Sequence, residues 1–215
     1  MTITHHPPED LLADFAAGTL DEAENLVVGV HVAGCVRCQR FVHAIEQLAG
    51  AAIEETEPVP ISAGAFDRLM TSIHNDPAPR PAHPMGAGAA EDQNLPELLR
   101  RRRLGRRRRV APGLSLQPIE LRGVGKARAF LLESAPGTRM LEHTHTGTEL
   151  TCVLRGSFSH EGGRYGPGDF DYGDGDVDHR PIVGDEAPCL CVVAMTGNLR
   201  VNGFFGRLIS PFVRL

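Results

Sequence analysis

The sequence contains no tryptophan and only two tyrosines among its 215 residues, so its cores must be built mainly from aliphatic side chains. It also lacks an excess of basic residues: 22 Lys and Arg stand against 27 Asp and Glu, for a formal net charge of -5. Non-specific binding to nucleic-acid phosphates usually needs a clear cationic excess. The composition therefore favours a protein or a small molecule as the partner.

Long apolar runs are missing as well. No segment offers the roughly 20 apolar residues that a membrane helix needs, and the start MTITHHPPEDLL lacks the basic and apolar regions of a signal peptide. We therefore expect a cytoplasmic protein without membrane contact. The cysteines form an odd set of five, and in a reducing compartment metal binding or burial is commoner than a structural disulfide.

The first part of the chain, residues 1–76, has the apolar periodicity of helices. Thr19 and Glu22 form a capping-box pattern that opens a second helix, and Gly34 ends it. The third helix ends in AGAAIEETEPVP, where two prolines stop it. We predict four helices, at about residues 9–17, 19–34, 35–52 and 62–74.

Residues 77–109 are expected to be a linker followed by an arginine-rich flank. The linker is rich in Pro, Ala and Gly, and buries too little apolar surface to offset the entropy of ordering. The run RRRRLGRRRR, residues 100–109, suggests either a nucleic-acid contact or a solvated flank of the next domain. We favour the flank, because the run lacks interleaved aromatic residues and the rest of the chain is acidic.

From residue 110 to 215 the pattern changes to short alternating or apolar runs, such as ELTCVLRG and PCLCVVAM, that glycine and proline punctuate closely. This spacing is typical of an antiparallel barrel or sandwich. Three of the cysteines lie here, and we expect them to be buried and inert: Cys152, Cys189 and Cys191.

The stretch HVAGCVRC carries a possible metal site. His31 falls in the last turn of the second helix, and Cys35 and Cys38 lie on one face at the start of the third. Zinc prefers four tetrahedral nitrogen or sulfur ligands, so the helix hairpin supplies three of the four. A thioredoxin-like redox pair is the alternative, but that motif normally follows a strand, and none is predicted here.

The fourth zinc ligand is open on spacing alone. His5 and His6 precede the first helix and can fold back onto the hairpin, and we prefer His6. His43, further along the third helix, is the weaker candidate. A zinc ion held in this way contributes folding energy to a module whose own core is small.

A second group of ligands fits the first cupin motif, in which Gly137, His143, His145, Glu149 and Gly156 occur at the required spacings. Residues two apart on a strand point to the same face, so the two histidines can reach one ion, and the glutamate enters from the next strand.

The second cupin motif contributes a fourth ligand, His179, at the expected distance after Gly168. The sequence departs from this motif at Asp174 and Asp176, where cupins commonly have Pro and Gly, and at Val183, where many enzymes have Asn. Three imidazoles and one carboxylate suit Zn, Fe, Mn or Ni, and the ligand types alone do not choose among them.

Taken together, the two motifs resemble the ChrR-type anti-sigma factors, which join a zinc-binding anti-sigma domain to a cupin-like barrel. The resemblance implies an N-terminal all-α zinc-stapled helical bundle and a C-terminal all-β cupin barrel, with zinc in both sites. It further implies a non-enzymatic protein that sequesters an extracytoplasmic-function sigma factor and releases it on an oxidative signal such as singlet oxygen. The residues that would face the sigma factor form the apolar stripe of the fourth helix: Phe66, Leu69, Met70 and Ile73. The same stripe would equally suit packing on the first three helices, since a lone stripe does not show its partner.

Two other functions compete with this interpretation. A metal-dependent cupin dioxygenase or isomerase with an accessory zinc domain would use the same ligands, but the sequence offers no evident general base beside them. A DNA-binding regulator would use the arginine run, but the sequence lacks a helix-turn-helix with a basic recognition face.

Overall fold

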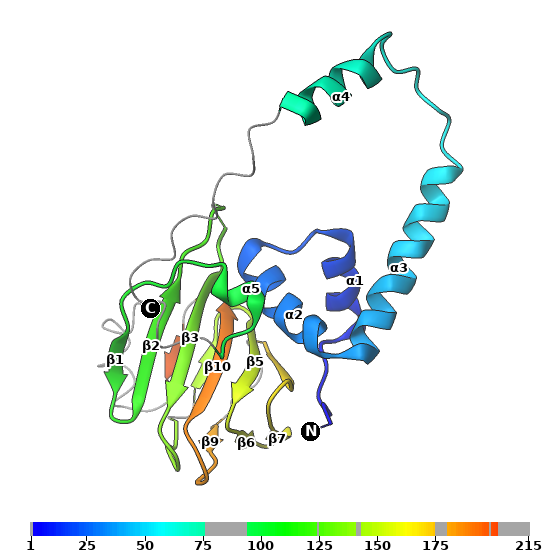
Figure 1. Cartoon of the computed structure of the whole chain (residues 1–215). Coiled ribbons are helices and arrows are strands. Elements are labelled where there is room, and N and C mark those ends of the chain that lie inside the picture. The colour runs from blue at the N-terminus through cyan, green and yellow to red at the C-terminus, as the bar shows by residue number, and fades with distance from the viewer. Residues whose placement is uncertain are drawn as a thin grey trace.

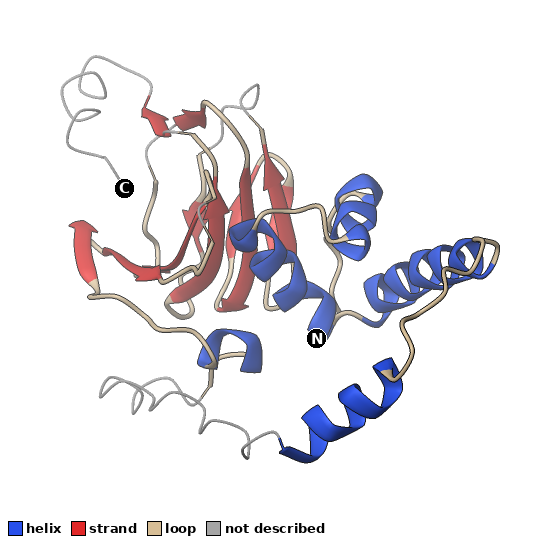
Figure 2. Cartoon of the chain, turned by 90° about the horizontal axis from the view of Figure 1, so that it is seen from above, coloured by secondary structure: helices blue, strands red, loops and turns tan. Residues whose placement is uncertain are grey.

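The computed structural model describes residues 2–75, 94–123, 125–140, 143–174, 180–197 and 199–201. Helices lie on one side of a six-stranded antiparallel sheet, and smaller sheets complete the fold (Figure 1, Figure 2). The predicted combination of N-terminal helices and a C-terminal antiparallel cupin-like fold is confirmed. No helix in these ranges is long and apolar enough to cross a membrane.

The helices follow the predicted order, and a fifth short helix lies in the segment expected to be a linker and flank. Their bounds are α1 Glu9–Ala17, α2 Glu22–Gly34, α3 Val36–Glu54, α4 Ala65–Asn75 and α5 Glu97–Arg100.

The strands form three antiparallel sheets, with orders β1-β2-β3-β10-β5-β8, β7-β6-β9 and β11-β4. Their bounds are β1 Arg108–Ala111, β2 Leu114–Ile119, β3 Arg128–Ser134, β4 His143–His145, β5 Glu149–Arg155, β6 Phe158–His160, β7 Gly163–Tyr165, β8 Phe170–Gly173, β9 Ile182–Val183, β10 Cys189–Met195 and β11 Leu199–Val201.

Strand β10 is buried along its whole length because both of its faces are covered. Leu190 and Val192 belong to a core shared with the helices, whereas Cys191 and Val193 belong to a second core with strands β6, β7 and β9. The alternation follows the period of two of a strand. The apolar run PCLCVVAM thus marks a central strand between two layers.

Helix α2 is the element that joins the helical part to the sheet. It contacts β3, β5 and β10 on one side and α1, α3 and α5 on the other. Seven of its thirteen residues are buried: Ala23, Leu26, Val27, Val28, Gly29, Val30 and His31. The helical and cupin-like parts therefore share one apolar core, although the domain bounds predicted from the sequence stay predictions.

The start of α2 differs from the expected capping box. Asp21, rather than Thr19, is the N-cap, and its carboxylate accepts hydrogen bonds from the backbone N–H groups of Ala23 and Glu24. The Thr19 hydroxyl instead donates to Asp14 at the end of α1. Both residue types are good caps, and here the carboxylate nearest the first turn takes the role.

The arginine-rich run is held against the fold by α5 and by ion pairs. Leu99 of α5 is fully buried in the core that contains α2. Within the run, Arg102 pairs with Glu22, Arg103 pairs with Glu120 at 3.7 Å, and Arg107 pairs with Glu133. Of these pairs, only Arg103 with Glu120 is exposed on both sides, and an exposed pair adds little stability. The fully buried Leu99 is therefore the apolar anchor of the segment.

Helix α4 lies away from the other described elements in Figure 1, and none of its residues is buried. Its apolar residues, which are spaced like the contact face of a packed helix, are exposed to solvent.

The anchoring role of α5 predicts that Leu99→Ala lowers the free energy of unfolding by about 2–5 kcal/mol, the usual cost of a cavity at a fully buried leucine. Leu98 is the matched control, because it neighbours Leu99 and is 40% exposed. Denaturant titration of the zinc-loaded protein measures both variants. Equal losses for Leu98→Ala and Leu99→Ala would contradict the packing of α5.

Candidate metal centre

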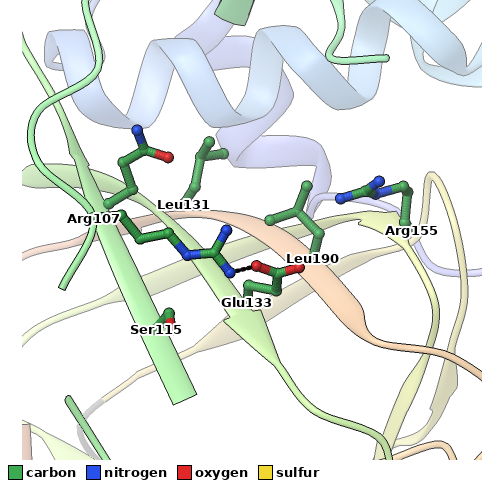
Figure 3. A pocket seen from close by; sticks show the side chains of 7 residues that line it. Arg107, Ser115, Leu131, Glu133, Arg155 and Leu190 are labelled. Carbon is green, nitrogen blue, oxygen red and sulfur yellow. Dashed lines mark ion pairs between the residues drawn. The ribbon is translucent and has the colours of Figure 1, made fainter. Parts of the chain in front are cut away.

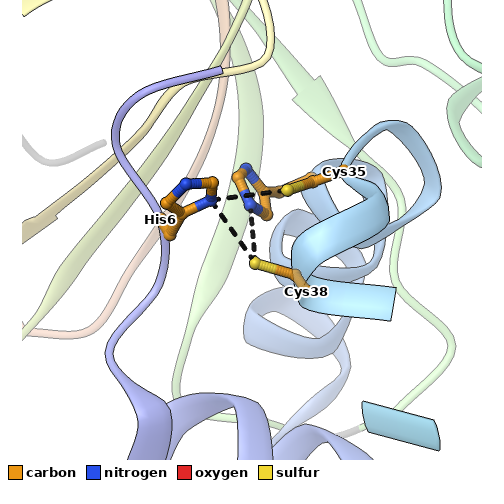
Figure 4. Close-up of side chains that lie close together, drawn as sticks. His6, Cys35 and Cys38 are labelled. Carbon is orange, nitrogen blue, oxygen red and sulfur yellow. Dashed lines mark hydrogen bonds between the residues drawn. The ribbon is translucent and has the colours of Figure 1, made fainter. Parts of the chain in front are cut away.

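Four potential metal ligands come together where the N-terminal segment meets the hairpin between α2 and α3. The donor atoms of His6, His31, Cys35 and Cys38 all lie within 4.8 Å of one another. The Nε2 atom of His31 is 3.2 Å from the Sγ atom of Cys38. The Nδ1 atom of His6 is 3.4 Å from the Sγ atom of Cys35 and 3.5 Å from that of Cys38 (Figure 4).

The hairpin explains how three of these groups meet. Cys35 lies between the two helices, as the C-cap of α2 and the N-cap of α3. Its backbone is extended, with φ -114° and ψ 103°, so the chain changes direction at this residue. His31 then lies in the last turn of one helix and Cys38 in the first turn of the next. All three side chains are buried, with exposed fractions of 4% or less.

Among the three candidates for the fourth ligand, the structure brings only His6 into the cluster. The ring of His5 packs on Tyr165, with 4.2 Å between the ring centroids. His43 lies on the exposed side of α3, where its Nε2 atom is 3.2 Å from the side-chain amide of Gln47. The path of residues 2–8 thus places His6, and not His5, beside the hairpin.

The chemistry of this donor set fits zinc. Two imidazoles and two thiolates are a common ligand set of structural zinc sites, and four ligands close the tetrahedral shell. Burial lowers the pKa of His31 and of His6, which keeps both imidazoles in the neutral form that binds metal.

Burial also dominates at the cysteines. It raises the pKa of Cys38 to about 12, and the hydrogen bond with Cys35 adds to the effect. Because a thiol must lose its proton to bind a metal, zinc uptake at this site releases protons.

The second predicted ligand set is described only in part. The backbone of His143 and His145 forms strand β4. Glu149 begins β5, where it is half-buried and accepts a hydrogen bond from the Thr151 hydroxyl at 3.2 Å. His179 lies outside the described residues.

A further histidine with close contacts, which the sequence did not single out as a site residue, is the half-buried His160. It lies at the end of β6, with its Nε2 atom 3.0 Å from Asp171 and its ring stacked on Tyr165. Its Nδ1 atom accepts a hydrogen bond from the backbone N–H of Gly162, so both ring nitrogens are engaged. The alternation of SFSHEG places Phe158 on the same face as His160 and was the available signal.

The remaining cysteines are buried, as expected, but they lie in two different layers. Cys152 belongs to the core shared with the helices, and burial raises its pKa to about 12. Cys189 and Cys191 face the second core, with their Sγ atoms 3.7 Å apart.

A small pocket opens on the helix-facing side of the large sheet, where Arg107 and Glu133 form an ion pair (Figure 3). Its volume is about 30 Å³, far below the roughly 300–1,000 Å³ of ligand pockets. This pocket is therefore too small to hold a substrate. Its lining residues are Arg107, Ser115, Gln117, Leu131, Glu133, Arg155 and Leu190.

The cluster predicts that His6→Ala or Cys38→Ser removes zinc from the N-terminal site, because three ligands hold the ion far less well than four. His43→Ala is the matched control, since His43 lies on α3 outside the cluster. Metal analysis of the purified full chains measures zinc per protein. Equal zinc loss in the His43 variant, or none in the His6 variant, would rule out this ligand set.

Both parts of the chain match known protein families. Residues 9–39 match a family described as putative zinc-finger, and residues 107–198 match the ChrR cupin-like domain family. The whole chain is 36% identical to the anti-sigma-E factor ChrR of Cereibacter sphaeroides, and the alignment covers 100% of both proteins.

A solved structure also has a fold similar to that of this chain. In the crystal structure of Rhodobacter sphaeroides SigE in complex with the anti-sigma ChrR, the matching chain has a TM-score of 0.75 and 33% identity, covering 90% of this chain and 99% of that chain. Both relatives are anti-sigma factors rather than enzymes, as expected for this protein. Because the likeness extends over the full length and both motifs, the chain belongs to the ChrR family of anti-sigma factors.

Proposed function

We propose that this protein binds an extracytoplasmic-function sigma factor in the cytoplasm, keeps it from RNA polymerase core, and releases it in response to an oxidant such as singlet oxygen. The observation that carries the proposal is the full-length likeness to ChrR, whose complex with SigE has been crystallised. No direct contact with nucleic acid or membrane is part of this function.

The exposed face of α4 supports the binding step. Its apolar residues recur at the i, i+3, i+4 and i+7 positions of one helical stripe. An apolar stripe without intramolecular cover suits a helix that lies in the groove of a partner. The exposed fractions are 67% for Phe66, 57% for Leu69, 36% for Met70 and 58% for Ile73.

The alternative role of this stripe, packing on the first three helices, does not fit its surroundings in the free chain. A residue that packs in an intramolecular core is usually less than a tenth exposed, as Leu12 and Leu26 are at 3%. The stripe residues are an order of magnitude more exposed. We therefore assign them to the sigma factor.

In this proposal the N-terminal zinc is structural. It ties the hairpin of α2 and α3 to the N-terminal segment, and so fixes the direction in which α3 leaves the fold toward α4. A structural zinc site contributes its binding energy to folding, which matters here because α3 has only two buried residues, Cys38 and Val42.

The release step is assigned to the cupin-like part. His143, His145, Glu149 and His179 would hold a second zinc ion, and imidazole ligands are plausible targets of oxidants. Modifying a ligand weakens the site, and the loss of a bound metal shifts a conformational equilibrium. Such a change would lower the affinity for the sigma factor.

The binding proposal predicts that Phe66→Ala and Leu69→Ala each weaken sigma-factor binding by about 10-fold or more, because truncating a hot-spot side chain costs about 2 kcal/mol. Asp67→Ala, on the same helix but outside the stripe, should bind like the unaltered protein. Titration calorimetry with the cognate sigma factor measures all three. Unchanged affinity for both stripe variants would refute the role of α4.

The release proposal predicts that His143→Ala and Glu149→Gln still bind the sigma factor but retain it when a photosensitiser generates singlet oxygen. Glu161→Gln serves as a control, because Glu161 is an exposed carboxylate in the same part of the chain. Size-exclusion chromatography of illuminated complexes gives the released fraction. Release from the His143 and Glu149 variants at the rate of the unaltered protein would disprove this assignment.

A further inference from the structure

The turn between β7 and β8, residues 166–169, contacts the N-terminal segment that places His6 among the four potential metal ligands. Asp169 at the end of this turn is 5% exposed. Its Oδ1 atom accepts hydrogen bonds from the backbone N–H groups of Thr4 at 2.7 Å and His5 at 2.9 Å. Its Oδ2 atom accepts one from the N–H of Gly166 at 2.8 Å.

His5, the residue before His6, is thereby held through both its backbone N–H and its carbonyl. While the N–H of His5 donates to Asp169, its carbonyl accepts a hydrogen bond from the N–H of Phe170 at 3.1 Å. Consecutive Cα atoms are about 3.8 Å apart along the chain, so fixing His5 leaves His6 little freedom. The position of the His6 ring in the cluster therefore depends on Asp169 and its neighbour.

The same turn also holds the second imidazole. The carbonyl of Gly168 lies 2.8 Å from Nδ1 of His31. A carbonyl only accepts, so Nδ1 carries the proton and the lone pair of Nε2 faces Cys38. Gly168 has φ +89°, and the space that a side chain would occupy there is filled by Ile3 at 2.8 Å. The turn is thus fitted closely to the N-terminal segment.

The four donor side chains of the cluster are consequently held in place by two different parts of the chain. The helix hairpin alone places Cys35 and Cys38, whereas the cupin-like part orients both histidines. Hydrogen-bonding partners of metal ligands fix the orientation of those ligands, and replacing such a partner typically costs about 10–100-fold in metal affinity.

We propose that Asp169 is a positioning residue of the N-terminal zinc site, through which the cupin-like part completes the site and retains the metal. This inference rests on the proposed Cys2His2 zinc ligands. Zinc retention by the N-terminal helices then depends on Asp169, which lies 131 positions after the last ligand, Cys38, in the cupin-like part of the chain.

Asp169→Asn tests the proposal with little change in volume. The amide has one acceptor oxygen and one donor nitrogen, so it cannot accept from the Thr4 and His5 side and from Gly166 at once. Asp171→Asn is the matched control: it alters a half-buried carboxylate two residues away that pairs with His160 and makes none of the hydrogen bonds that Asp169 makes to residues 4 and 5.

The measurement uses the full chain loaded with cobalt in place of zinc. Only the cysteine-containing site gives thiolate-to-cobalt charge-transfer absorption, because the cupin ligand set has no sulfur. We expect this absorption to disappear about 10–100-fold faster in Asp169→Asn than in the unaltered protein after addition of excess EDTA. Asp171→Asn should lose it at the unaltered rate.

The outcomes separate this inference from the zinc site itself. If the unaltered protein shows no thiolate-to-cobalt absorption, the ligand assignment fails. If it shows the absorption but Asp169→Asn loses cobalt at the unaltered rate, or Asp171→Asn loses it equally fast, the role of Asp169 is wrong and the ligand assignment stands.

A second variant covers the case in which circular dichroism shows that Asp169→Asn does not fold. Thr4→Pro removes a backbone donor to Asp169 from the exposed N-terminal segment. It leaves the turn and the sheet intact. Faster cobalt loss in Thr4→Pro supports the proposal, and an unaltered rate overturns it.

Discussion

The burial of α2 from Leu26 to His31 is the constraint on which the rest of the structure depends. Both of its ends are fastened to the cupin-like part by hydrogen bonds. At the start, the Asp21 and Glu22 carboxylates accept from backbone N–H groups of Ala127, Arg122 and Gly123. At the end, His31 donates to Gly168. A helix fixed in this way cannot shift without disturbing both the sheet and the metal cluster.

This arrangement gives the two halves of the molecule a defined relation. The metal cluster lies at their junction, and α3 carries the chain from there to the exposed face of α4 (Figure 1). The turn that supports the cluster is also bonded to β5, since the backbone N–H of Val153 donates a hydrogen bond of 3.0 Å to the carbonyl of Asp169. Glu149, a proposed ligand of the second metal, begins that same strand. Strand β5 thus connects the turn beside the His6, His31, Cys35 and Cys38 cluster with a residue of the proposed second site.

The sequence was informative wherever the deciding contacts are local. Helical periodicity and Gly34 placed α2, and the spacing of His31, Cys35 and Cys38 predicted their meeting, because a hairpin brings neighbours in sequence together. It could not choose between His5 and His6, because that choice depends on Asp169, more than 160 residues away. The contacts of His160 and the packing of Leu99 could not be predicted for the same reason: each depends on a distant element.

The central claim, that a zinc-stapled helical part of this chain captures a sigma factor, is tested most directly by co-expression. The full chain is produced with an extracytoplasmic-function sigma factor from its own organism, and the complex is purified and analysed for metal. The account predicts a stable complex of one chain with one sigma factor that contains zinc bound through Cys35 and Cys38. A folded, zinc-loaded chain that captures no such sigma factor would contradict it.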